Sequence, residues 1–107
     1  MLTYFGHSSA NALEFNISDP YAYENAGRYP FFFVNGCNAG NFFLYDTTRF
    51  SSSNQTLSEK YVLARRRGSI AFVASTHYGI VNYLRLYIDA LYAALSGSHY
   101  GMPIGAI

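Results

Sequence analysis

Phe31-Phe32-Phe33-Val34-Asn35-Gly36-Cys37-Asn38 is the segment that best indicates the architecture of this 107-residue chain. Four consecutive apolar residues, three of them aromatic, predict a strand covered on both faces, as the strands of parallel sheets are. The polar and small residues that follow predict a chain reversal directly after it. Cys37 is therefore expected at the carboxyl end of a buried strand.

Two similar apolar runs flank this segment, Leu2 to Phe5 and Ile70 to Ala74. Each also ends in small or polar residues, which include His7 after the first run and His77 after the third. The segments between the runs are long enough for crossover connections, so we predict an α/β fold with a mostly parallel sheet. Ligands and catalysis gather at the carboxyl ends of such strands.

Two helices are predicted. Thr56-Leu57-Ser58-Glu59 fits a capping box, and the helix that it starts is expected to hold the three arginines at 65–67 in its last turn and to stop at Gly68. A second helix is expected over about residues 80–96, with an apolar stripe for packing and with Gly97 at its end. Between the second strand and the first helix, a short helix and then a polar loop are expected over residues 38–55.

Composition limits the function classes. The chain is 50% apolar, 19% aromatic and 12% charged, which predicts one ordered domain with its own core. A net charge of +1 argues against a dedicated nucleic-acid binder, and no apolar run is long enough for a membrane span. One cysteine excludes an intrachain disulfide. Both ends are apolar, whereas domain termini are usually polar, so we expect residues 1–107 to be a single partial domain, truncated at both termini.

His7 and Cys37 are the candidate reactive pair. A lone cysteine is most often a small buried hydrophobe, and a lone histidine is most often a loop or core residue. Here, however, both follow consecutive strands, and neighbouring strands lie ~4.8 Å apart, so the two side chains are expected to reach one reacting group. A histidine beside a thiol is the arrangement that activates a cysteine nucleophile.

The chain resembles the gingipain-like cysteine peptidases, family C25, whose fold is caspase-like. Gly6-His7-Ser8-Ser9 is similar to the histidine segment of that family. Residues 31–42 are similar to its strand-then-cysteine segment, and residues 68–76 to the strand that follows. The helix expected near residue 57 lies where the family has one. The resemblance covers nearly the whole chain, in order, and implies a three-layer sandwich that is incomplete at both ends.

The resemblance also implies site residues and a reaction. His7 corresponds to the catalytic histidine and Cys37 to the nucleophile, while the backbone amides of Ser8 and Cys37 correspond to the oxyanion donors. Ser75 and Thr76 correspond to the wall of the pocket for the residue before the scissile bond. The implied activity is that of a secreted or surface-exposed cysteine endopeptidase that hydrolyses proteins or peptides through a thioester acyl-enzyme, without a cofactor.

In the family, the acidic residue that orients the histidine precedes the first strand. Residues 1–107 alone are therefore expected to be inactive and to need the rest of the parent polypeptide.

Other functions stay open from the sequence alone. The chain is compatible with a non-catalytic or transpeptidase-type relative that acts in protein secretion or surface attachment. A small-molecule-binding α/β domain is a further alternative, although residues 36–40 lack the lysine and the glycine pattern of a phosphate loop. His77 is a rival base that we expect to be a loop histidine. The three histidines show no close pairing, so no metal site is predicted.

Overall fold

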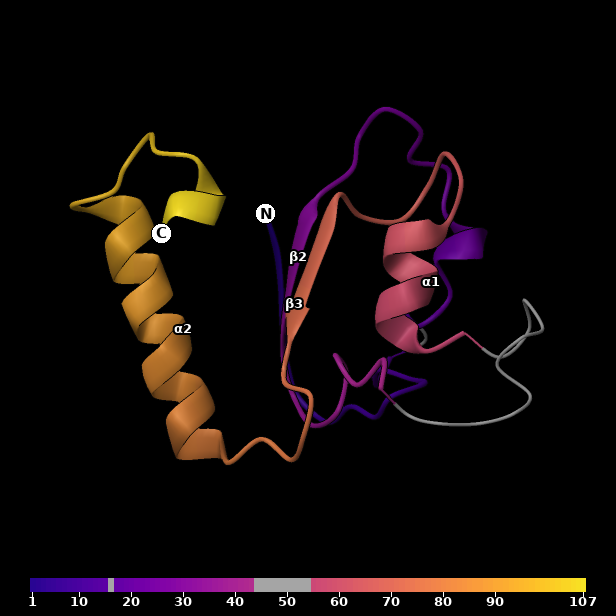
Figure 1. Ribbon diagram of the computed structural model, residues 1–107, viewed down its shortest axis with the longest axis horizontal. Coiled ribbons are helices and arrows are strands. Elements are labelled where there is room, and N and C mark those ends of the chain that lie inside the picture. The colour runs from indigo at the N-terminus through magenta and orange to yellow at the C-terminus, as the bar shows by residue number, and fades with distance from the viewer. Residues whose placement is uncertain (16, 44–54) are drawn as a thin grey trace.

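The structure is a computed structural model, and it describes residues 1–15, 17–43 and 55–107. Three parallel strands, in the order β1-β2-β3, form an open sheet with helix α1 on one face and helix α2 on the other (Figure 1). β1 is Leu2–Phe5, β2 is Phe31–Asn35 and β3 is Ala71–Ala74. The predicted α/β fold with a parallel sheet is confirmed.

The strand bounds follow the apolar runs closely. β1 is as predicted, β2 extends one residue further to Asn35, and β3 begins one residue later because Ile70 lies outside the sheet, with 71% of its surface exposed. Phe5 pairs with Asn35, and Val34 pairs with Ala74. All three strands therefore end at the same edge of the sheet, the carboxyl edge.

The core lies between the sheet and α1, which spans Leu57–Leu63. Leu57, Tyr61 and Ala64 share one buried face, as their spacing predicts. The ring of Phe32 lies edge-on to Tyr61, with ring centroids 5.0 Å apart, and edge-on to Phe72 at 5.2 Å. These edge-to-face contacts are a favoured aromatic geometry and join β2, β3 and α1 into one core.

Of the three strands, only β2 is buried. The prediction that all three apolar runs are covered on both faces is wrong for β1, where Leu2 and Phe5 are 47% and 51% exposed, and for β3, where Val73 is 37% exposed. In the described chain β1 and β3 are edge strands, so each has a sheet neighbour on one side only. The sequence shows which residues of a strand are apolar. Whether those residues are buried depends on which other elements pack against the strand, and the apolar run alone does not show this.

The start of α1 is as predicted and its end is not. The capping box is present, with the Glu59 carboxylate accepting from the Thr56 amide at 2.8 Å. The helix nevertheless stops at Leu63, and the three arginines lie in a loop where Arg66 has a positive φ of 63°. The chain reverses early because the Ser69 amide bonds to the carbonyl of Tyr61 at 2.9 Å, which directs the backbone into β3.

α2 spans Val81–Ser96 with Gly97 as its C-cap, so the predicted helix is confirmed. Its apolar stripe faces the sheet, but no residue of α2 is buried, so the stripe packs more loosely than expected. The clearest contact is a stack of Tyr87 on Phe33, with centroids 5.7 Å apart and an interplanar angle of 12°. Among the described residues, none of the helices is long and apolar enough to cross a membrane.

Shorter elements complete the chain. Single 3-10 turns form at Pro20–Ala22 and Ile104–Ala106. The short helix expected after β2 is absent from residues 38–43, which form turns. Most of the remainder of that expected helix and of the polar loop lies outside the described residues.

Candidate active site

The predicted site residues follow the three strand ends at the carboxyl edge. His7 comes two residues after β1, Cys37 comes two residues after β2, and Ser75 and Thr76 come directly after β3. Since Phe5 pairs with Asn35 and Val34 with Ala74, the topology delivers all four residues to one edge of the sheet.

The loop after β1 contacts the cysteine segment directly. The Ser8 hydroxyl donates to the carbonyl of Cys37 at 2.8 Å, and the amide of Gly6 donates to the carbonyl of Asn35 at 3.1 Å. This approach needs a glycine at position 36, where a Cβ would collide with the Ser8 hydroxyl and lie 2.7 Å from the carbonyl oxygen of Gly6. Gly36 therefore lets the histidine loop and the cysteine segment lie against each other.

The loop after β3 holds the cysteine segment from the other side. The amide of Gly40 donates to the carbonyl of Ser75, and the amide of Asn38 donates to the carbonyl of His77, each at 2.9 Å. Asn38 has a positive φ of 58°, a conformation that asparagine tolerates better than most residues. Backbone pairing between the second and third segments thus continues past the strands.

The Cys37 thiol is free and half-buried, and it contacts the backbone of Gly79. Its Sγ accepts from the amide of Gly79 at 3.3 Å and lies 3.7 Å from the carbonyl oxygen of the same residue. The thiol is therefore not a packing group of the apolar core, which lies on the α1 side of the sheet.

Both histidines at this edge are exposed. The carbonyl of His7 accepts from the Tyr4 hydroxyl at 2.7 Å, a contact that fixes the backbone of the first loop. His77 matches the prediction of a loop histidine, because its Nδ1 accepts from the adjacent amide of Tyr78 at 2.7 Å and its carbonyl accepts from the Ser75 hydroxyl at 2.7 Å.

The amides of Ser8 and Cys37 lie at this edge, and the contacts of the described residues show how each is used. Ser8 is bridged to Leu13, but the bridge uses the amides of Ser9 and Glu14, which donate to Ala12 and His7. Within the described residues, the amides of Ser8 and Cys37 make no hydrogen bond. No other described residue therefore accepts a hydrogen bond from either amide.

A cavity of about 400 Å³ lies beside the thiol on the α2 side of the sheet. Its lining is mostly apolar and comes from β2, β3, the loop after β3 and the first half of α2. Ser75 belongs to this wall and Thr76 does not. The lining also includes Asn35 and Gly79, which the sequence analysis did not single out. Asn35 could have been found from strand alternation, which places it on the same face as Phe33.

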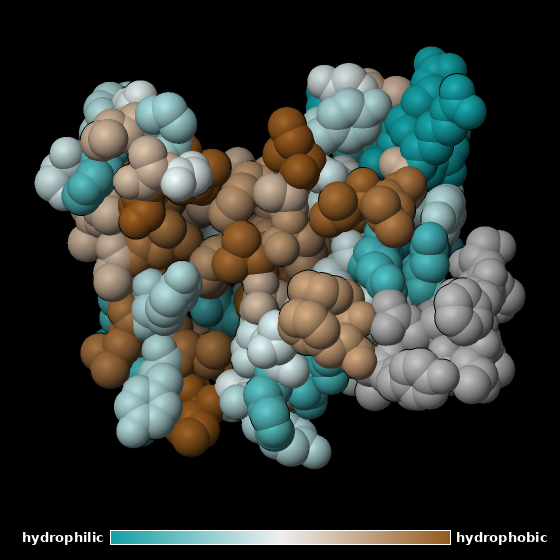
Figure 2. Space-filling model, in the orientation of Figure 1, coloured by the Kyte–Doolittle hydropathy of each residue, from teal (hydrophilic) through white to brown (hydrophobic). Residues whose placement is uncertain are grey.

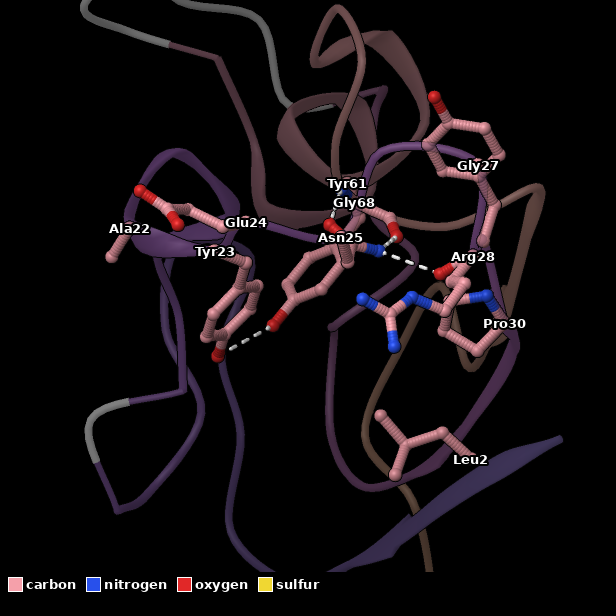
Figure 3. Close-up of a pocket in the computed structure, with 11 residues that line it drawn as sticks. Leu2, Ala22, Tyr23, Glu24, Asn25, Gly27, Arg28, Pro30, Tyr61 and Gly68 are labelled. Atoms are coloured by element: carbon pink, nitrogen blue, oxygen red, sulfur yellow. Dashed lines mark hydrogen bonds between the residues drawn. The ribbon is translucent and has the colours of Figure 1, made fainter.

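A second cavity, of about 880 Å³, lies at the opposite edge of the sheet (Figure 3). Its lining includes Leu2, the first residue of β1, and Pro30, which directly precedes β2, so the cavity lies at the edge where these two strands begin. The Asn25 side chain in its wall donates to the carbonyls of Arg28 and Gly68, at 2.9 and 2.8 Å. Burial, reinforced by the neighbouring Tyr23 hydroxyl, raises the pKa of Tyr61 well above its ordinary value. This cavity is not part of the Cys37 site.

One comparison with known proteins identifies the chain. A family model, Peptidase family C25, matches residues 1–107, the whole sequence. No curated protein and no solved structure gives a significant match. The family is one of cysteine peptidases, which agrees with a free thiol at the carboxyl edge of a parallel sheet. The chain belongs to peptidase family C25.

Proposed function

We propose that this protein is a cysteine endopeptidase in which Cys37 is the nucleophile and His7 is the acid–base group. The observation that carries the proposal is the contact between the two loops: the residue after His7 hydrogen bonds to Cys37 itself, at 2.8 Å. The topology adds that these loops leave neighbouring parallel strands at one edge. In the proposal, His7 acts as the general base that removes the proton of the Cys37 thiol, which turns the sulfur into a nucleophile.

The proposed reaction is acyl transfer in two steps. His7 takes the thiol proton, and the sulfur of Cys37 forms a bond to the scissile carbonyl carbon. His7 then donates that proton to the leaving amine as the carbon–nitrogen bond breaks, which leaves a thioester. In the second step His7 removes a proton from water, the resulting hydroxide attacks the thioester, and the carbon–sulfur bond breaks to release the acid. His7 then returns its proton to the Cys37 sulfur, which restores the thiol and the neutral imidazole.

The oxyanion formed in each step needs hydrogen-bond donors. The amides of Ser8 and Cys37 are the proposed donors, since neither has an acceptor among the described residues. A donor of this kind contributes ~3 kcal/mol to transition-state stabilisation. The Gly79 amide, which already donates to Sγ at 3.3 Å, supports the developing thiolate.

The remaining features of the proposal rest on the family. The substrate is a protein or peptide, and Ser75 lies in the wall of the cavity proposed for the residue before the scissile bond. Thr76, the exposed residue that follows, is not part of that wall. The site of action is extracellular or at the cell surface. Residues 1–107 form a partial domain that the rest of the parent polypeptide completes.

Thiol reactivity tests the proposal. In the protein expressed from its complete reading frame, Cys37 is expected to react with iodoacetamide at pH 6 at least about tenfold faster than glutathione, because a paired imidazole raises the thiolate fraction. His7→Gln should remove this advantage. His99→Gln is the matched control, since His99 lies after α2 and bonds to Ser98.

Peptide cleavage gives the second readout. Cys37→Ala should abolish it, and His77→Gln should leave most of it. The proposal is wrong if Cys37 reacts no faster than glutathione, or if cleavage persists in Cys37→Ala protein.

A further inference from the structure

We propose that the surface around the three arginines at 65–67 is a docking site for an acidic segment of a partner protein. This surface, which we call the arginine surface, comprises the loop after α1 and the turn at residues 23–28. It lies at the edge of the sheet opposite Cys37. The inference therefore goes beyond the proposed function and does not depend on peptidase activity.

Two adjoining cavities form the arginine surface. The cavity of about 880 Å³ described above and a smaller one of about 430 Å³ share Tyr23 and Glu24 in their walls. Arg28 belongs to the wall of the larger cavity, and residues 65–67 belong to the wall of the smaller one. A single inorganic anion would fill only a small part of this space, whereas an extended peptide with several carboxylates can follow both cavities.

The arginine surface carries a net positive charge. Its described lining holds four arginine side chains and one carboxylate, that of Glu24, which leaves three net positive charges. Figure 3 shows the Glu24 carboxylate well apart from the Arg28 guanidinium, with the rings of Tyr23 and Tyr61 between them. Figure 2 shows the hydrophilic side chains that gather over the loop after α1. A positive surface of this kind attracts and orients a negatively charged partner.

Most of these guanidinium groups have no partner within the described residues. There, the guanidinium groups of Arg28, Arg65 and Arg66 make no ion pair and no hydrogen bond, and all three residues are exposed. Arg67 donates to the carbonyl of Tyr21 and keeps further donors, since a guanidinium has five. The adjacent like charges repel one another, so a carboxylate that binds between them relieves this repulsion as well as accepting hydrogen bonds.

The backbone holds the arginine loop in one conformation. Arg66 adopts a positive φ of 63°, and the Asn25 side chain bonds to both the amide and the carbonyl of Gly68, at 3.0 and 2.8 Å. A partner that binds a loop already held in place loses less conformational entropy on binding.

Tyrosines beside the arginines favour a protein as the partner. Tyr21 and Tyr29 are 45% and 39% exposed, and Tyr23 lies in the walls of both cavities. Arginine and tyrosine are enriched at protein–protein interfaces and among the residues that dominate their binding energy. A nucleic acid is a poorer fit, because the net charge of the chain is only +1.

The test measures peptide binding to the protein expressed from its complete reading frame. A fluorescein-labelled hexaglutamate peptide should bind with saturation in fluorescence anisotropy, and the labelled hexaglutamine peptide should not. Raising the salt concentration from about 50 to about 200 mM should weaken the binding at least about threefold, because the contacts are between charged groups.

Substitutions separate the arginine surface from general charge. The double variant Arg65→Gln/Arg66→Gln should weaken hexaglutamate binding at least about fivefold, whereas Arg65→Lys/Arg66→Lys should retain most of it. Both positions are exposed and lie outside α1, so these variants are expected to fold, which urea denaturation checks. Arg85→Gln is the matched control, because Arg85 is an exposed arginine of α2 that already pairs with Asp89 at 3.5 Å. It should change the Kd less than about twofold.

Cys37→Ala separates this inference from the proposed function. The variant should bind hexaglutamate as the unsubstituted protein does, whether or not the unsubstituted protein cleaves peptides. Loss of hexaglutamate binding in this variant would contradict a docking surface that is independent of the thiol.

Three other results would overturn the inference. The first is the absence of saturable hexaglutamate binding, and the second is equal weakening by Arg85→Gln and by Arg65→Gln/Arg66→Gln. The third is tighter binding of an oligothymidylate with the same number of charges, which would assign the arginine surface to a nucleic acid instead.

Discussion

At position 36, the loops that follow β1 and β2 lie too close together for any side chain larger than that of glycine. A Cβ at this position would collide with the Ser8 hydroxyl and lie 2.7 Å from the carbonyl oxygen of Gly6. Gly36→Ala should therefore push the histidine loop away from Cys37. We expect it to lower the free energy of unfolding by about 1–3 kcal/mol, as overpacking does, and to slow iodoacetamide labelling.

Urea denaturation and labelling rates measure these two effects. Gly105→Ala is the matched control, because a Cβ there meets no atom within 4 Å, and it should change neither quantity. Unaltered stability in Gly36→Ala would contradict the close approach of the two loops.

The sequence predicted His7 and Cys37 as edge residues because apolar runs and the small residues after them locate strand ends well. It did not predict the partner of the thiol. Gly79 reaches Sγ only because the loop after β3 folds back over the cysteine segment, and nothing in the local pattern of residues 75–79 indicates that path.

In α1, a local signal sets the start of the helix but not its end. The capping box that starts α1 lies within four residues and was predicted correctly. The end of α1 depends on Asn25, far away in the chain, whose side chain accepts from the amide of Gly68 at 3.0 Å and donates to its carbonyl at 2.8 Å. A contact of this kind has no signature near the helix, so the arginines at 65–67 were misplaced.

Asn25→Ala tests this account of the α1–β3 connection. The change removes three hydrogen bonds, two to Gly68 and one to the carbonyl of Arg28. At about 1 kcal/mol each, the free energy of unfolding should fall by about 2–3 kcal/mol, measured by urea denaturation. Asn11→Ala is the comparison, since Asn11 is exposed and its described hydrogen bond comes from its backbone amide. Equal effects of the two substitutions would contradict the role of Asn25.

The two faces of the sheet are unequally covered. The buried aromatic core lies between the sheet and α1. Helix α2 lies on the other face (Figure 1), and none of its residues is buried. Tyr61 joins the parts of the well-covered side, because its ring contacts Phe32 and Phe72 and its hydroxyl donates to the carbonyl of Ile17. Global stability should therefore depend strongly on the protonation of this one phenol.

The pH dependence follows from the raised pKa of Tyr61. Below the ordinary tyrosine pKa of about 10, the phenol is neutral in both the folded and the unfolded state, and its contribution to stability is constant. Above that pH the unfolded state loses the proton first, so stability falls as the pH rises, by up to about 1.4 kcal/mol per pH unit.

Urea denaturation between pH 9.5 and 11 should show this slope in the unsubstituted protein. Tyr61→Phe should be less stable at neutral pH, because it loses the bond to Ile17, but its alkaline slope should be shallower. Parallel slopes would argue against burial of a neutral phenol at this position.

The backbone anchoring of the Cys37 sulfur also bears on how such a protein can change. Its described hydrogen-bonding partners are main-chain atoms of Gly79, so none of the described side chains supplies a hydrogen bond to the sulfur. Substitutions in the cavity that leave the backbone of Gly79 in place therefore keep both of these contacts. In this architecture, evolution could retarget the protein without first rebuilding its chemistry.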